Sequence, residues 1–162
     1  MPSTPIPNTI PTALLESPSF QLERLRRRTR DEVEAALATR NTTQREYWVL
    51  TCLADADAAS QSALSEALAI DASDMVRLID VLEKNGWVKR ERDPRDRRRQ
   101  IVAATKKGTK AQSELAQLIH EAEERALDVS TNKQLKHLRK LASTILAAEE
   151  VGEDGTDAEA AH

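Results

Sequence analysis

Strong helix breakers are almost absent from the central part of this 162-residue chain. Between residues 19 and 148, the only glycines and prolines are Gly86, Pro94 and Gly108. These two residue types most often end regular structure, so irregular backbone is expected between the two glycines and helix elsewhere. Only four aromatic side chains are present, which is few for a core built from β-sheet. The sequence therefore predicts a mainly α fold.

The spacing of apolar residues divides the central part into helices. They are expected at residues 19–39, 43–56, 60–69, 72–85, 106–128 and 131–149. Thr43 and Glu46 match a capping box, and Asp71 stands where it caps the helix over 72–85. Gly86 follows that helix in the position where glycine commonly ends one.

The two ends of the chain differ from its centre in composition. Five of the six prolines lie at or before Pro18, so residues 1–18 are expected to form an extended arm. Residues 149–162 carry six acids and no Lys or Arg, and are expected to be a disordered acidic tail that solvates or regulates the protein. Without this tail the net charge changes from −3 to +3. Residues 19–148 are long enough for one domain.

Several classes of protein are excluded by what the sequence lacks. No run of 18 apolar residues is present, and the first residues lack the basic start of a secretory signal, so neither a membrane span nor secretion is expected. A single cysteine, Cys52, suits a reducing cytosol and is expected to be a buried thiol. No phosphate-binding loop, Cys-x-x-Cys or His-Glu-x-x-His occurs, so no enzyme activity, cofactor or metal site is expected. His120 and His137 lie on different expected helices.

A strongly basic segment interrupts the helical pattern. Residues 89–99 contain seven basic and three acidic side chains, between the β-prone pairs Trp87-Val88 and Ile101-Val102. Asp93 and Pro94 favour a turn at its centre. The pattern predicts a β-hairpin with a basic tip, directly after two short helices. Arginines at such a tip suit the minor groove of DNA, and the alternative is a solvated run of charge.

The residues around this hairpin carry a resemblance to a known family. Residues 64–88 closely resemble the winged helix–turn–helix of the MarR family of transcriptional regulators. The family's wing pattern matches Asp96, Arg98, Thr105 and Gly108, with Ala104 where leucine is usual. Residues 47–50, Tyr-Trp-Val-Leu, are similar to the family's second helix. The resemblance covers about residues 19–148.

The resemblance implies a winged helix–turn–helix fold with a two-stranded β-wing and flanking dimerisation helices. The DNA-binding lobe would span about residues 60–104, and the dimerisation helices about 19–39 and 106–148. It implies a cytoplasmic homodimer that binds double-stranded DNA, with the helix at 72–85 in the major groove and the wing in the minor groove. It also implies a repressor that a small, possibly aromatic ligand releases from its operator. Because some members of the family sense oxidants through a cysteine, the alternative is a redox-sensing regulator that uses Cys52.

The expected DNA contacts come from the recognition helix and the wing. They are Ser73, Asp74, Arg77, Arg95, Arg97 and Arg98. Asp74 suits a hydrogen bond from cytosine N4, or a purely structural place near the positive end of its helix. By resemblance, Asp80 and Arg98 form an ion pair between helix and wing, and the alternative for Asp80 is an unpaired surface charge. Ala72, Asp74 and Val76 depart from the family's usual basic or hydroxyl residues, which leaves open a protein–protein module without operator recognition.

The ligand site implied by the family would draw on few aromatic residues. Phe20, Tyr47 and Trp48 are the candidates for lining it, and the alternative is that they belong to the core. A carboxylate on the ligand would pair with one of the basic residues of the first long helix, Arg24, Arg27 or Arg28.

Overall fold

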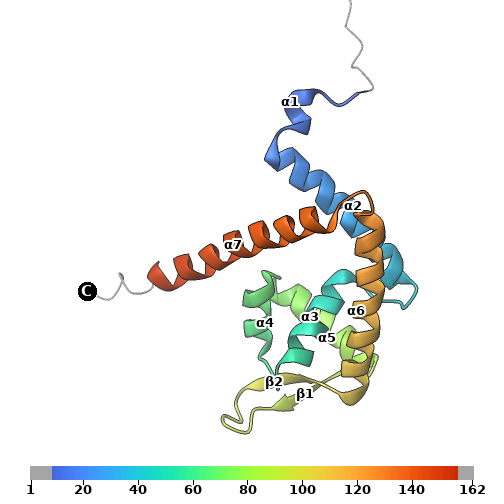
Figure 1. The fold of residues 1–162 in the computed structure, drawn as a ribbon. Coiled ribbons are helices and arrows are strands. Elements are labelled where there is room, and N and C mark those ends of the chain that lie inside the picture. Colours follow the sequence, from blue (N-terminus) through green and yellow to red (C-terminus); the bar gives the residue numbers. More distant parts are fainter. Residues whose placement is uncertain (1–8, 157–162) are drawn as a thin grey trace, which may run out of the picture. The chain divides into compact units, whose positions relative to one another are not determined.

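The computed structural model describes the backbone of residues 9–156 and the side chains of residues 9–150. The chain divides after Ala126 into two compact units. The elements of the first unit are α1 (Thr12–Leu15), α2 (Pro18–Ala38), α3 (Gln44–Asp55), α4 (Gln61–Leu68), α5 (Ala72–Lys84), β1 (Val88–Arg92), β2 (Gln100–Ala104) and α6 (Lys106–Ala126) (Figure 1). The second unit contains α7 (Asn132–Thr156).

The mainly α fold with a two-stranded hairpin confirms the predicted fold class. Each predicted helix is present and starts within one residue of its expected position. Two differences lie near the ends. A single helical turn, α1, replaces extended chain after Pro11, whose φ of −58° already suits a helix. Helix α7 continues to Thr156, past the predicted start of the acidic tail at Glu149. The remainder of the predicted arm and tail, residues 1–8 and 157–162, lies outside the described residues.

Most helix ends follow the sequence signals, but Asp71 stands at the start of α5 without the predicted capping hydrogen bond, because its carboxylate accepts from the Ser73 hydroxyl. The Thr43 side chain accepts from the amide of Glu46, whose carboxylate accepts from the amide of Thr43, so the capping box is complete. Gly86 has a φ of +75° and ends α5, and the amide of Trp87 donates to the carbonyl of Leu82. These are the features of a Schellman motif, in which the left-handed position favours glycine.

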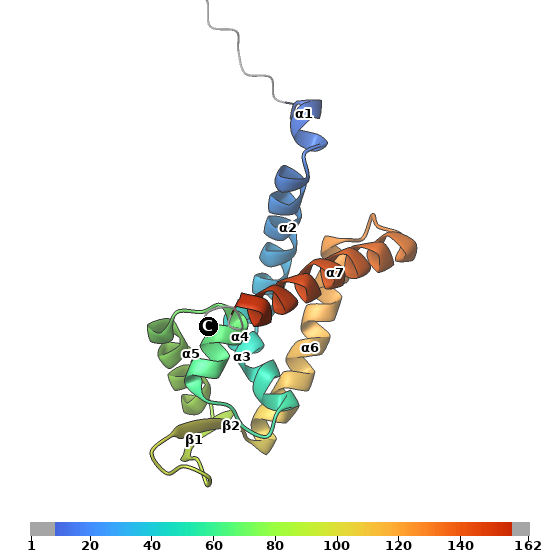
Figure 2. The ribbon, with the colours of Figure 1, turned by 90° about the vertical axis from the view of Figure 1, so that its left-hand side faces the viewer.

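A single apolar core joins the helices and the hairpin of the first unit. Its fully buried side chains include Leu37 of α2, Leu50 of α3, Ile79 of α5, Val102 of β2 and Leu115 of α6. Helices α3, α4 and α5 pack together, and the hairpin lies across one end of this group (Figure 2). Because the core reaches both α5 and the base of the hairpin, it holds these two elements in a common frame.

The hairpin is fixed to the helices at its base. Strands β1 and β2 are antiparallel, with Arg90 opposite Val102, and the outer edge of β2 exchanges two backbone hydrogen bonds with Ala59. At the end of β2, the Thr105 hydroxyl donates to the carbonyl of Gly86 at 2.7 Å and accepts from the amide of Gly108 at 3.0 Å. Thr105 therefore caps α6 and ties it to the end of α5.

Helix α7 is capped by Thr131, whose hydroxyl accepts from the amide of Gln134. None of its described side chains is buried, and the exposed apolar ones include Leu138, Leu141 and Ile145. Their spacing of three and four places them on one face of the helix. Among the described residues, no helix is long and apolar enough to cross a membrane, and no three His, Cys, Asp or Glu side chains are arranged to hold a metal ion.

Candidate nucleic-acid interface

The first turns of α5 present a polar surface beside the hairpin. The Ser73 hydroxyl donates to the Asp71 carboxylate at 2.5 Å, and this hydrogen bond lowers the pKa of Asp71. Val76 and Arg77 are exposed, and 78% of the Arg77 side chain is open to solvent. Because Met75 and Ile79 are fully buried on the opposite face, α5 cannot rotate to hide these groups.

Asp74 lies between two arginines. The carboxylate is 3.6 Å from the guanidinium of Arg45 on α3 and 3.6 Å from that of Arg77, one helical turn along α5. The three residues border an open hollow of about 260 Å³. Glu46 borders the same hollow, so its two arginines are balanced by two acids. The sequence did not point to Arg45, because its contact with Asp74 joins residues that are far apart in the chain.

The tip of the hairpin, residues 93–99, is held by its own aspartates. The Asp93 carboxylate accepts from the amide of Arg95 at 2.9 Å, and that of Asp96 accepts from the amide of Arg98 at 3.1 Å. Both acids are thereby occupied with the turn itself. Within the described part of the chain, the exposed side chains of Arg95, Arg97 and Arg98 have no acidic partner. The tip therefore presents three exposed arginine side chains on a turn whose backbone is held in place.

The resemblance predicts an ion pair between Asp80 and Arg98, and this prediction is wrong. Asp80 pairs instead with Arg90 on β1. The distance from the Arg90 guanidinium to the Asp80 carboxylate is 2.6 Å, and Glu83 binds the same guanidinium at 3.0 Å. Arg98 lies at the tip of the hairpin, whereas Arg90 lies at its base, beside α5. A sequence signal for this contact of Arg90 is the alternation of side chains along β1, which places Arg90 on the same face as the buried Val88.

The three candidate ligand-binding aromatics do not line one pocket. Phe20 borders a hollow of about 440 Å³ at the junction of α1 and α2, where Arg24 lies 5.9 Å from the ring centroid. Trp48 borders a different hollow of about 300 Å³ between α2 and α3. Tyr47 packs against the core. The cations that border the hollow beside Trp48 are Arg26 and Arg30. The sequence predicts Arg24, Arg27 or Arg28 instead.

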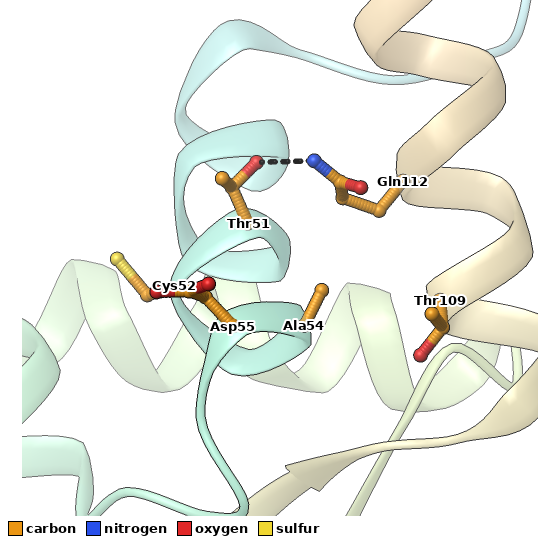
Figure 3. Close-up of a pocket in the computed structure, with 6 residues that line it drawn as sticks. All are labelled: Thr51, Cys52, Ala54, Asp55, Thr109 and Gln112. Carbon is orange, nitrogen blue, oxygen red and sulfur yellow. Dashed lines mark hydrogen bonds between the residues drawn. The ribbon is translucent and has the colours of Figure 1, made fainter.

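Cys52 lines a further hollow, of about 380 Å³, between α3 and the start of α6 (Figure 3). The Gln112 amide donates to the Thr51 hydroxyl at 3.4 Å across it, and the Cys52 thiol points away from α6. Burial raises the pKa of this thiol above its ordinary value. A raised pKa lowers the thiolate fraction and therefore the reactivity at neutral pH.

Comparison with known proteins agrees with this geometry. The model of the MarR family matches residues 42–99. The HTH-type transcriptional regulator PrsX of Escherichia coli is 30% identical over 133 residues, which span 74% of this chain and 80% of PrsX. A putative transcriptional regulatory protein for the hcr operon of Thauera aromatica is 34% identical over 73 residues, which span 45% of this chain and 44% of that protein.

Solved structures share the fold over most of the chain. CouR from Rhodococcus jostii RHA1, bound to p-coumaroyl-CoA, is 26% identical with a TM-score of 0.73, covering 83% of this chain and 95% of CouR. A mutant MarR from Escherichia coli, complexed with operator DNA, is 19% identical with a TM-score of 0.71, covering 85% of this chain and 99% of that MarR. The second likeness shows the fold alone. The MarR family model matches the helix–turn–helix and most of the wing, and PrsX is similar to this chain along most of its length. The chain therefore belongs to the MarR family of transcriptional regulators.

Proposed function

We propose that this regulator is a homodimer that binds operator DNA through α5 and the wing (residues 88–104), and that it represses transcription until a small aromatic ligand releases it. The observation that carries the proposal is that two groups of exposed arginines lie on elements held by the same apolar core. Arg77 extends from α5, and Arg95, Arg97 and Arg98 extend from the wing tip without acidic partners in the described part of the chain. Phosphates and a narrow minor groove both favour such exposed arginines.

The neutralisation of Asp74 supports DNA as the partner rather than another protein. An isolated acid on the recognition helix would repel the phosphate backbone. Here Arg45 and Arg77 both bind the carboxylate, which offsets its negative charge and reduces that repulsion. The fold that E. coli MarR uses with operator DNA is also the fold of this chain.

Exposed apolar faces support a homodimer. In the first unit, the side chains of Leu14, Leu15 and Leu22 are between 44% and 59% exposed on α1 and α2. In the second unit, those of Leu141, Ile145 and Leu146 are between 53% and 59% exposed on α7. Apolar groups gathered in this way usually mark a surface that another chain covers. Light scattering after size-exclusion chromatography is expected to give a dimer, and a stable monomer at micromolar concentration would contradict it.

The hollow beside Trp48 is the place where we propose that the ligand binds. An indole that is 40% exposed offers a stacking surface, and Arg26 and Arg30 offer positive charge. Their present acidic neighbours, Glu23 and Asp31, are exposed and hold them weakly, at 3.9 and 3.3 Å. CouR was solved with p-coumaroyl-CoA, which supports an aromatic acid or its thioester as the ligand.

Footprinting on genomic fragments, with binding measured at several salt concentrations, tests the DNA proposal. Specific binding with a steep salt dependence is expected. Weak binding that ignores sequence would instead support a protein–protein module. A reporter gene driven by the footprinted promoter is expected to rise when the regulator is deleted, and a fall would indicate an activator.

The ligand proposal is tested with p-coumarate and p-coumaroyl-CoA. Either is expected to quench Trp48 fluorescence and to release the DNA, and Arg26→Ala is expected to weaken this response. Arg24→Ala is the matched control, because Arg24 lies beside Phe20 in the other hollow. Equal effects of the two substitutions would move the site away from Trp48.

A further inference from the structure

Arg90 joins three elements of the DNA-binding lobe through one side chain. Its guanidinium donates to Asp80 at 2.6 Å and Glu83 at 3.0 Å on α5, and to Gln61 at 3.1 Å on α4. Its backbone amide also donates to the Glu83 carboxylate, at 3.1 Å. Only 17% of the Arg90 side chain is exposed, whereas the side chains of Asp80 and Glu83 are 59% and 44% exposed.

We propose that Arg90 is a positioning residue that sets the angle of the wing relative to the recognition helix. The proposal rests on the DNA-binding function proposed above and adds a residue that need not touch DNA. Arg90 is suited to this because a guanidinium carries five donors in a fixed fork and can bind several acceptors in one geometry. A lysine at this position could keep the charge but could not hold Gln61 and both acids in the same directions.

The position of Arg90 in the hairpin gives it leverage. The core fixes the start of β1, where Trp87 and Val88 are buried, but the outer half of the wing has no apolar anchor. From Arg90 to the tip is about five residues, or about 17 Å of strand. A rotation of about 10° at the base would therefore move the tip by about 3 Å, as much as one strand residue spans. A displacement of that size would take the tip arginines away from the groove that α5 selects.

Asp80 provides a test in which the sign of the effect decides. The Asp80 side chain is 59% exposed beside the proposed DNA surface. If charge alone mattered, removing this negative group would strengthen binding to DNA. If Asp80 acts by holding Arg90, the same change would weaken binding, because the wing loses its angle.

The experiment compares Asp80→Asn with Glu91→Gln in DNA-binding titrations. Glu91 is the matched control, because it lies on β1 and pairs only with Lys89 among the described residues, at 3.6 Å. We expect Asp80→Asn to weaken specific binding about fivefold, because the amide oxygen still accepts a hydrogen bond but no longer carries the charge that strengthens it. We expect Glu91→Gln to leave it equal or tighter. Tighter binding by Asp80→Asn would overturn the proposal.

A second measurement needs no DNA. Trypsin cleavage at the wing tip, after Arg95, Arg97 or Arg98, is followed by mass spectrometry well below the unfolding temperature. We expect Arg90→Lys and Asp80→Asn to be cut several-fold faster than the wild type and Glu91→Gln, with unfolding midpoints close to that of the wild type. Unchanged cleavage would overturn the positioning role. If the wild type bound no DNA fragment, the proposed function would fail, while cleavage would still decide the role of Arg90.

Discussion

Gly108→Ala tests whether the junction of wing and α6 depends on a close approach of backbone to backbone. A Cβ atom at Gly108 would lie 1.8 Å from the carbonyl oxygen of Trp87, whereas real Cβ contacts essentially never fall below 3.0 Å. The Trp87 carbonyl would have to withdraw by more than an ångström. It now accepts from the amide of Thr105 at 2.9 Å, so this hydrogen bond would be strained as well.

The expected loss of stability combines three effects. Overpacking costs about 1–3 kcal/mol, and the strained hydrogen bond costs about 1 kcal/mol. The better helix propensity of alanine offsets about 1 kcal/mol. The net loss for Gly108→Ala is therefore about 1–3 kcal/mol, which corresponds to a fall of roughly 5 °C in the unfolding midpoint. Helix propensity alone would predict a rise.

Thermal unfolding followed by circular dichroism measures this difference, at one protein concentration because dimerisation would shift the midpoint. Gly86→Ala is the matched control. Its Cβ would meet only the Lys107 side chain, at 3.8 Å, but the φ of +75° disfavours alanine. It is therefore expected to cost about 1 kcal/mol from conformation alone. A midpoint for Gly108→Ala at or above that of the wild type would refute the reasoning.

Further predictions concern a buried acid, the cysteine and the DNA-binding arginines. Burial raises the pKa of the Glu46 carboxyl above its ordinary value, so this carboxyl is protonated at a higher pH in the folded chain than in the unfolded chain. The stability gained from its protonation is therefore lost as pH rises through the raised pKa. Glu46→Gln, which keeps the capping box, is thus expected to raise the unfolding midpoint at pH 7, and the gain should vanish below about pH 4.5; a constant gain would contradict this. The raised pKa of the Cys52 thiol predicts slow alkylation by iodoacetamide at pH 7, measured by mass spectrometry. Redox sensing would be supported instead if peroxide released the wild type from DNA but did not release the Cys52→Ser variant. Arg77→Ala should cost about 1–3 kcal/mol of binding free energy at one base position of the operator, whereas Arg97→Ala should weaken binding to all sequences and lower the salt slope by about one unit. Equal effects of the two substitutions in binding titrations would show that Arg77 and Arg97 do not have these separate roles.

The helices could be predicted because local signals determine them. The scarcity of breakers, the capping box at Thr43 and the glycine after α5 each act within a few residues, and the structure follows them closely. The partners of charged side chains could not be predicted in this way. Arg90 meets Gln61 from 29 positions away, and Asp80 could have reached several nearby cations. Only packing, which sets the distance from α5 to the base of β1, selects among them.

The scattering of the aromatic residues has the same origin. The rarity of aromatic residues suggests one site for Phe20, Tyr47 and Trp48, yet Tyr47 and Trp48 are adjacent on one helix and therefore point about 100° apart. Tyr47 turns to the core, whereas Trp48 turns to α2. Composition identifies which residues are unusual, but the helical period decides which surface each one reaches.

The hydrogen bonding at the base of the wing also bears on how this protein avoids aggregation. A two-stranded hairpin has two outer edges, and an unpaired edge can recruit a strand from another molecule. At the register of Arg90 and Val102, the outward amide of β1 is bound by the Glu83 carboxylate and that of β2 by the carbonyl of Ala59. Further out, the strands end in charged side chains. At this register, therefore, neither outer edge of the wing offers a free amide for a strand of another chain to bind.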